Sequence, residues 1–170
     1  MGLCIQADAG SRSQFYPAIM PARLNAALGF LETPAKANHT SIATFHRERL
    51  MSDYSDRLNA TKAGYPFRRW QESGLEQYTA EACSAFAGVF DQLIAELLQV
   101  GPEAAEPVML AAFEKAVIAL NTLNESDESL IETGEREDLC ELVNTITVAA
   151  GLDPSKYGDG EGPASEWRDW

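Results

Sequence analysis

The longest regular hydrophobic pattern in this chain lies between Gly74 and Val100. Apolar residues recur there every three or four positions, which is the spacing that keeps side chains on one face of an α-helix. These residues are Leu75, Tyr78, Ala82, Phe86, Val89, Leu93 and Leu97, joined toward the C-terminal end by Phe90, Ile94 and Leu98. Gly101 followed by Pro102 ends such a helix, because glycine adopts the cap conformation and proline cannot continue the hydrogen bonding. The pattern predicts a core helix over residues 74–100.

Two more helices are predicted after the core helix, over residues 104–123 and 134–150. The apolar stripes are Met109, Ala112, Phe113, Ala116, Val117, Leu120 and Leu123 in the first, and Leu139, Leu142, Val143, Ile146 and Ala150 in the second. Thr133 is the expected N-cap of the second helix. The short connection after Gly101 predicts an antiparallel hairpin. We expect both helices to cover the widened end of the core helix, so that these three helices form the better-defined half of the fold.

Weaker patterns precede the core helix. Residues 1–17 show no periodicity and are expected to form a flexible arm, and a short helix is predicted over 18–31. The next predicted helix covers 41–59, with Asn38 or Thr40 as its N-cap. Its apolar stripe consists of Ile42, Phe45, Leu50, Tyr54 and Leu58.

Residues 152–170 form a glycine-rich tail, and its last five residues, 166–170, fit one helical turn. No segment alternates apolar and polar residues as a strand does, and the chain contains no internal repeat. A chain of 170 residues is long enough to bury one hydrophobic core without disulfides. The sequence therefore predicts an all-α fold, a single-domain helical bundle of about five helices over residues 1–170.

The charge of the chain is acidic and unevenly distributed. The formal net charge is −13. Residues 1–70 contain nine Lys or Arg and five Asp or Glu, whereas residues 71–170 contain four Lys or Arg and 21 Asp or Glu. Net acidity argues against nucleic acid or an anionic membrane as partner, because phosphate contacts require cations. The asymmetry indicates either an acidic binding surface or pairing between the two halves.

The three cysteines, Cys4, Cys83 and Cys140, are too few and too far apart for a disulfide framework, which favours a reducing compartment. The N-terminal residues show no secretory pattern. The start MGLCIQ resembles a myristoylation signal, but Gln6 stands where Ser or Thr is required. No run of apolar residues approaches the ~18 that a membrane helix needs. The sequence therefore favours a soluble, cytoplasmic protein.

The candidate chemical motifs do not match known ligand patterns. His39 and His46 have neither the H-E-x-x-H spacing nor a Glu three residues before them. The tail from Asp153 onward has Gly158 at the sixth position of a calcium loop, but Ala164 replaces the Glu that binds the ion bidentately. No glycine-rich phosphate loop occurs. We therefore expect no metal, no cofactor and no recognisable catalytic residue.

Two short segments combine aromatic and charged residues. In FRRW (67–70), we expect Phe67 and Trp70 to anchor the segment in the core while the two arginines pair with acids of the C-terminal half. Four residues are too few for a nucleic-acid surface. Trp167 and Trp170 either cap the core of the protein, which we favour, or form a docking tag for a partner.

The most suggestive candidate for a binding site is an acidic cluster that contains only one cation, Arg136. Its carboxylates are Glu125, Asp127, Glu128, Glu132, Glu135, Glu137, Asp138 and Glu141. One interpretation is a solvated loop followed by a helix N-terminus. The other is a docking face for a basic protein, since complementary charge raises association rates and specificity. On this second interpretation the cluster, with Trp167 and Trp170, is the candidate partner-binding site.

The segments IETGEREDLCEL (131–142) and EWRDW (166–170) resemble the C-terminal pattern of a group of small all-helical bacterial proteins. The resemblance covers about the last hundred residues. It implies a helical fold in a bacterial protein, and it brings no activity and no functional residue with it.

Three functions remain open from the sequence. The first is a cytoplasmic acidic binding protein, of the immunity or inhibitor kind, that engages a basic partner protein. The second is a small helical enzyme that uses carboxylates with Arg68 or Arg69 between helices; the lack of a nucleophile, metal or phosphate motif makes it less favoured. The third is a structural subunit whose apolar helix face is completed by self-association.

Overall fold

The computed structural model describes residues 37–127 and 129–170, with side chains from residue 42 onward. All described residues belong to one compact unit, which covers residues 36–170. The predictions of a flexible arm over 1–17 and of a helix over 18–31 lie outside the described residues. The prediction of a single domain over residues 1–170 stays a prediction.

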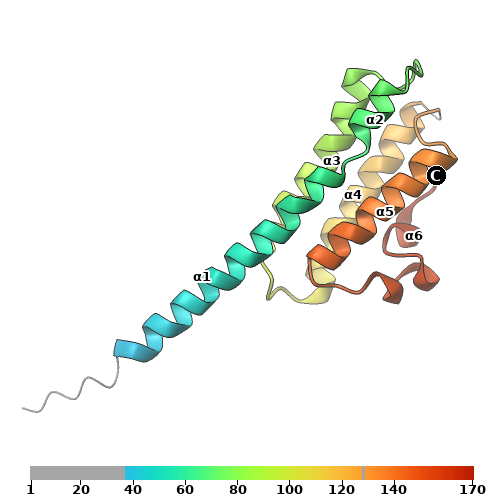
Figure 1. Ribbon diagram of the computed structural model, residues 1–170. Coiled ribbons are helices and arrows are strands. Elements are labelled where there is room, and N and C mark those ends of the chain that lie inside the picture. The colour runs from blue at the N-terminus through green and yellow to red at the C-terminus, as the bar shows by residue number, and fades with distance from the viewer. Residues whose placement is uncertain (1–36, 128) are drawn as a thin grey trace, which may run out of the picture. The chain divides into compact units, whose positions relative to one another are not determined.

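The described residues form helices and no strand, which confirms the predicted all-α bundle (Figure 1). The elements are α1 (Ala37–Ala60), η1 (Thr61–Gly64), α2 (Phe67–Glu72), α3 (Ala80–Val100), α4 (Glu106–Ser126), α5 (Thr133–Ala149), η2 (Pro154–Lys156), η3 (Gly158–Gly160) and α6 (Ala164–Trp167). The four long helices, α1, α3, α4 and α5, alternate in direction (Figure 1). This is the up-and-down arrangement that short connections favour.

The predicted α3–α4 hairpin is confirmed, and α5 has its closest neighbours elsewhere. α3 and α4 form the closest helix pair, as the short connection between them predicts, and α3 also packs against α2 and α1. α5 approaches α1, η1 and α6 more closely than it approaches α3 or α4. In the tail, α6 packs against both α4 and α5.

α3 begins six residues later than the core helix predicted over 74–100. Gly74 has a φ of 80°, in the left-handed region that glycine adopts without strain. The side chain of Thr79 then accepts a hydrogen bond from the amide of Ala82, 3.1 Å away, and caps the helix. Leu75 and Tyr78 fit the helical period, but this local capping bond sets the boundary.

The C-terminal end of α3 is covered, as expected for the widened apolar face. Phe90, Leu93, Ile94 and Leu97 are buried. The hydroxyl of Tyr54 in α1 also donates a hydrogen bond of 3.3 Å to the carbonyl oxygen of Leu97. The cover over this end therefore includes α1 as well as the following helices.

By length and composition, α3 is also apolar enough to cross a membrane, with a mean hydropathy of 1.3 over its best window. This contradicts the expectation that no segment of the chain approaches that level. The central helix of a soluble protein passes the same test. Phe86, Phe90 and Leu97 of α3 lie in the protein core, so packing against the neighbouring helices accounts for its apolar character.

α1 departs from its prediction in two ways. It begins at Ala37, so Asn38 and Thr40 lie inside the helix and neither is the N-cap. Tyr54 and Leu58 are buried as expected, but Ile42 and Phe45 are 67% and 68% exposed. The N-terminal half of α1 thus presents apolar side chains that nothing in the described part of the chain covers.

The later boundaries shift by a few residues. α4 runs over Glu106–Ser126, with Pro107 in its first turn, where the missing N–H costs nothing. α5 begins at Thr133 itself, with Glu132 in the N-cap position, so Thr133 is not the predicted cap. The final helical turn is α6, two residues earlier than the predicted 166–170.

Candidate functional site

The short helix α2 is fixed in place by a cluster of aromatic rings. The ring of Phe67 lies 5.1 Å from the ring of Trp70, 5.9 Å from Phe86 and 5.8 Å from Phe90, measured between centroids. Phe67 and Trp70 are buried, so the prediction that both anchor this segment in the core is confirmed. Aromatic pairs at these distances add specific geometry to the hydrophobic burial, and this geometry determines where the neighbouring Arg69 lies.

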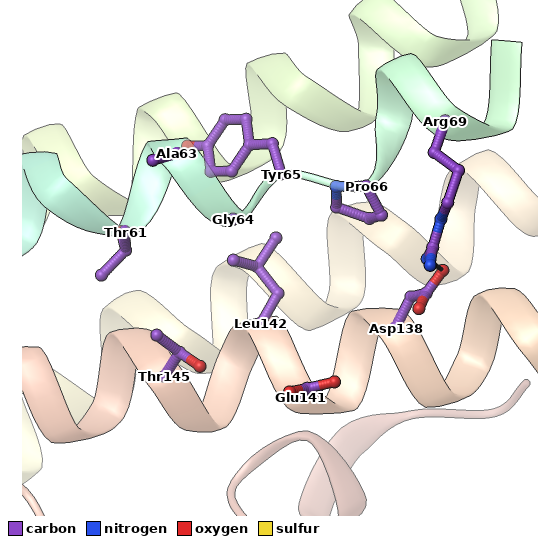
Figure 2. Close-up of a pocket in the computed structure, with 10 residues that line it drawn as sticks. All are labelled: Thr61, Ala63, Gly64, Tyr65, Pro66, Arg69, Asp138, Glu141, Leu142 and Thr145. Carbon is purple, nitrogen blue, oxygen red and sulfur yellow. Dashed lines mark hydrogen bonds and ion pairs between the residues drawn. The ribbon is translucent and has the colours of Figure 1, made fainter. Parts of the chain in front are cut away.

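Trp70 and Arg69 join α2 to α5 through one carboxylate. The indole Nε1–H of Trp70 donates a hydrogen bond of 2.8 Å to Oδ2 of Asp138. The guanidinium of Arg69 forms an ion pair with the same oxygen, and Figure 2 shows these two side chains meeting. Hydrogen bonding and charge from Asp138 raise the pKa of Arg69. Arg68 instead pairs with Glu72 in its own helix. Both arginines therefore pair with acids of residues 71–170, as predicted, and only the pair of Arg69 joins two helices. We call this contact the α2–α5 junction.

One side of the junction is a hollow of about 370 Å³ between η1 and α5, which we call the η1 hollow (Figure 2). Its lining residues are Thr61, Ala63, Gly64, Tyr65, Pro66, Arg69, Asp138, Glu141, Leu142 and Thr145. In Figure 2, Arg69 reaches from α2 toward Asp138, while Leu142 points from α5 toward the η1–α2 connection. Glu141 supplies a further carboxylate at the exposed edge of this hollow.

A second hollow, of about 380 Å³, shares Arg69 and Asp138 with the first, and we call it the Tyr78 hollow. Its lining residues are Arg69, Trp70, Ser73, Leu75, Tyr78, Gly134, Glu135, Glu137 and Asp138. Tyr78 is 4% exposed, and its hydroxyl lies close enough to the side chains of Glu135 and Gln77 for hydrogen bonding. Burial raises the pKa of Tyr78, and the nearby carboxylate of Glu135 raises it further.

Some carboxylates of the predicted acidic cluster form contacts within the protein, and others are exposed without an ion pair. Asp138 holds the junction, and Asp127 accepts hydrogen bonds from the amide and hydroxyl of Ser129. Glu135 is half-buried beside Tyr78. The exposed members that form no ion pair within the described residues are Glu125, Glu132, Glu137 and Glu141. We call these four residues the acidic edge.

Glu128 of the predicted cluster lies outside the described residues. Glu137 and Glu141 are four residues apart on α5, so they share one side of the helix. Glu132 lies at the N-cap position of the same helix, and Glu125 lies in the last turn of α4. The acidic edge thus extends from the end of α4 along the first half of α5.

The two C-terminal tryptophans pack partly buried against the core, which confirms that they cap it. The carbonyl oxygen of Trp167 accepts a hydrogen bond of 2.9 Å from the side chain of Asn121 in α4. The guanidinium of Arg168 lies 5.9 Å from the ring of Trp170, within cation–π range, and donates to the sulfur of Cys140. These contacts tie the tail to α4 and α5 and leave part of each indole exposed.

The remaining candidate groups show no assembled chemistry in the described residues. No group of three or more His, Cys, Asp and Glu there has an arrangement that could hold a metal ion. Cys83 and Cys140 are free thiols whose pKa values are raised by burial. His46 is exposed, and the side chain of His39 lies outside the described part. The tail at Asp153 forms a local turn, in which its carboxylate accepts from the amide and hydroxyl of Ser155.

Sequence reasoning missed Tyr78 as a site residue and treated Asp138 as one carboxylate among eight. The sequence does contain a signal for the role of Asp138, because a buried tryptophan needs an acceptor for its indole N–H.

Comparison of the chain with protein-family models, curated proteins and solved structures finds no match.

Proposed function

We propose that the protein is an acidic helical binding protein whose acidic edge docks a basic partner protein. The observation that supports this proposal is the set of four exposed carboxylates on α4 and α5 without a cationic partner in the described chain. Glu137 and Glu141, four residues apart on α5, repel one another, and a cationic surface that covers them relieves the repulsion.

The uneven charge of the chain favours the same function. The acids outnumber Lys and Arg by 17 in residues 71–170, so the field around α4 and α5 attracts cations over a long range. Such a field raises the rate of association with a basic protein and disfavours acidic competitors. A small cytoplasmic protein that neutralises a basic toxin or enzyme would use this physics, and we assign the protein to that immunity or inhibitor class.

Charge reversal on the acidic edge tests the proposal. The variant carries Glu132→Lys, Glu137→Lys and Glu141→Lys, and it spares Asp138 because that carboxylate also holds Trp70 in place. The matched control reverses three exposed acids elsewhere, Glu81, Glu103 and Glu114, and so changes the net charge equally. We expect the first variant to lose the basic partner and the control to keep it.

Self-association through α1 is a second candidate, and the exposed Ile42 and Phe45 favour it. Continuing in steps of three or four, the same face of α1 carries Arg49, Asp53 and Asp56. In an antiparallel pair of α1 helices centred on residue 51, Arg49 of one copy lies opposite Asp53 of the other. This face lies opposite buried Tyr54 and Leu58, so the two bundles would sit on opposite sides of the pair.

Sedimentation of the full chain decides this second candidate. We expect a dimer for the wild type and a monomer for Phe45→Glu. Arg49→Asp should weaken the dimer, and combining it with Asp53→Arg should restore it, because the pair of charges is then exchanged. A wild type that stays monomeric at high protein concentration would rule out self-association.

The enzyme alternative gains no support from the junction. Arg69 and Asp138 bind each other, and the same carboxylate accepts from Trp70. Arg69 and Asp138 therefore serve to hold α2 against α5.

A further inference from the structure

We propose that residues 161–170 are a displaceable strap, and that an arginine-containing segment of the basic partner takes their place on α4 and α5. The strap includes α6, which packs against both of these helices. The incoming segment carries an arginine between two aromatic residues, as the strap itself does in Trp167, Arg168 and Trp170. This inference rests on the proposed docking function and names a further seat for the same partner.

Two asparagines bind the backbone of the strap. The side-chain amide of Asn121 in α4 donates a hydrogen bond of 2.9 Å to the carbonyl oxygen of Trp167. The side-chain amide of Asn144 in α5 donates one of 3.1 Å to the carbonyl oxygen of Glu161. Backbone carbonyl groups occur in every peptide, so these two hydrogen bonds do not require the sequence of the strap.

The strap leaves polar atoms unsatisfied where it meets α4 and α5. The Oδ1 atoms of Asn121 and Asn144 and the indole Nε1–H of Trp170 are buried and have no hydrogen-bond partner among the described residues. Asn121 is only 9% exposed, and its amide is turned toward the strap. Buried polar groups in this condition cost free energy, which weakens the hold of the strap. A segment with a backbone N–H opposite Oδ1 of Asn121 would form one more hydrogen bond.

The residues just before the strap are suited to act as a hinge. Gly158, Asp159 and Gly160 have φ values of 55°, 56° and 95°, in the left-handed region. Glycine adopts these values without strain, whereas an aspartate there costs free energy. On the other side of the hinge, Tyr157 is anchored by a hydrogen bond of 2.9 Å to Glu106 of α4. Rotation within residues 158–160 can therefore release the strap while Tyr157 stays in place.

Charge favours a basic segment over the strap. Against one cation, Arg168, the strap carries three exposed carboxylates, those of Glu161, Glu166 and Asp169. The strap lies beside the acidic edge, because Arg168 and Glu137 line the same hollow of about 280 Å³. A basic segment that lacks the three carboxylates would be attracted to this side of α5, where the strap is repelled. The hollow is where such a segment makes its first contact.

The surroundings of Arg168 show why the incoming segment carries an arginine between aromatic rings. The guanidinium donates a hydrogen bond of 3.0 Å to Sγ of Cys140 and lies 5.9 Å from the ring of Trp170. Trp167 and Trp170 pack partly buried against the hydrophobic core. A partner segment with these side chains in the same order would repeat the contacts of the strap.

The test adds an unlabelled peptide to the isotopically labelled full chain and follows the indole N–H resonances of the protein by NMR. The peptide has the sequence of the strap with three neutral replacements, Glu161→Gln, Glu166→Gln and Asp169→Asn. Displacement should move the resonances of Trp167 and Trp170, saturably, to the positions of unstructured tryptophan, while that of Trp70 stays unchanged. A peptide that also carries Arg168→Ala should bind about fivefold more weakly.

Gly162→Ala sharpens the test, because the added Cβ would lie 1.8 Å from Oδ1 of Asn144 and loosen the strap. The strap competes with the peptide from within the same chain, so loosening it should tighten peptide binding by about tenfold. Gly88→Ala, whose added Cβ meets nothing within 4 Å, is the matched control and should bind as the wild type does. Thermal unfolding checks the fold of both variants, and the wild type alone carries the test if Gly162→Ala does not fold.

Three results would overturn the inference. The first is that the Trp167 and Trp170 resonances stay in place at the highest soluble peptide concentration, whether or not the peptide binds elsewhere. The second is equal binding of the peptide by the wild type and by a folded Gly162→Ala variant. The third is equal binding of the peptide that carries Arg168→Ala.

Failure here is distinguishable from failure of the docking function. If the basic partner is lost on reversal of the acidic edge but binds the wild type and Gly162→Ala equally, the docking function stands and displacement of the strap is excluded. If the peptide displaces the strap and Gly162→Ala binds the partner more tightly, while reversal of the acidic edge has no effect, the seat of the strap is the binding site and the acidic edge is excluded.

Discussion

Trp70 and Asp138 stand 68 residues apart in the chain and are joined by a hydrogen bond of 2.8 Å from the indole N–H to Oδ2. This bond connects α2, which is packed on α3 by aromatic rings, to the first half of α5, which carries the acidic edge. The position of the acidic edge relative to the core therefore depends on a carboxylate that belongs to the same acidic cluster.

We expect Asp138→Ala to lower the free energy of unfolding by about 1–3 kcal/mol, because it leaves the buried indole N–H of Trp70 without an acceptor. Arg69→Ala should cost less than about 1 kcal/mol, since the Arg69 side chain is 70% exposed and surface ion pairs contribute little. Urea unfolding of the two variants measures the difference. Equal losses would mean that the ion pair, and not the indole bond, holds the junction.

Phe67→Ala should destabilise the protein by about 3–5 kcal/mol, because the ring is buried against Trp70, Phe86 and Phe90. Leu75→Ala is the control and should change stability by less than about 0.5 kcal/mol, since Leu75 is largely exposed. Thermal and urea unfolding give both values. A small loss for Phe67→Ala would show that α2 is not anchored by the aromatic cluster.

The sequence predicted the helical class, the α3–α4 hairpin and the anchoring role of Phe67 and Trp70. It placed the start of α3 too early, because Leu75 and Tyr78 fit the helical period while the boundary is set by a local bond from Thr79. It also expected Ile42 and Phe45 to share the buried stripe of Tyr54. At 3.6 residues per turn, however, Phe45 lies on the opposite side of α1 from Tyr54, so the apolar pattern drifts away from the face that packs against the bundle.

The sequence groups the carboxylates of the acidic cluster but does not show which of them have contacts within the protein. Asp138 and Glu137 are adjacent and chemically alike in the sequence, yet one holds the junction and the other is exposed without an ion pair. Their contacts differ because α2 packs against α5 at Asp138, and the sequence does not show this packing. The same holds for Tyr78, because its burial beside Glu135 depends on what surrounds it in the fold.

Gly162→Ala should detach the tail from α5. An added Cβ would lie 1.8 Å from Oδ1 of Asn144, and the φ of Gly162 is +107°, which an alanine adopts only with strain. The loss should be about 1–3 kcal/mol, with increased exposure of Trp167 and Trp170 to fluorescence quenchers. Gly88→Ala is the matched control, because its added Cβ meets nothing within 4 Å and should stabilise α3 by about 0.5–1 kcal/mol. An unchanged Gly162→Ala variant would contradict the tail packing.

Tyr157 should make stability depend on pH in the alkaline range. Its hydroxyl donates a hydrogen bond of 2.9 Å to Glu106, and burial together with this carboxylate raises its pKa to about 12. In the unfolded chain the pKa is about 10. The folded state therefore binds the proton more tightly, so the contribution of Tyr157 is fully present below pH 10 and is lost as the pH rises toward 12.

The stability advantage of the wild type over Tyr157→Phe should therefore shrink across this interval, as measured by urea unfolding at several pH values. An advantage that grows with pH would contradict the assigned direction. The other tyrosines are present in both proteins, so their ionisation largely cancels in the comparison.

The most direct measurement of the docking function is capture of proteins from an extract of the organism that encodes the chain, at about 0.1 M and about 1 M salt. The Debye length falls from about 10 Å to about 3 Å between these conditions, so contacts between exposed charges are screened. The immobilised baits are the wild type, the variant with Glu132, Glu137 and Glu141 changed to Lys, and the control with Glu81, Glu103 and Glu114 changed to Lys. We predict one basic protein that the wild type and the control retain at low salt, that high salt releases, and that the acidic-edge variant does not bind. Retention of that protein by the acidic-edge variant, or its retention undiminished at 1 M salt, would contradict docking through the acidic edge, as would the absence of any basic partner at either salt.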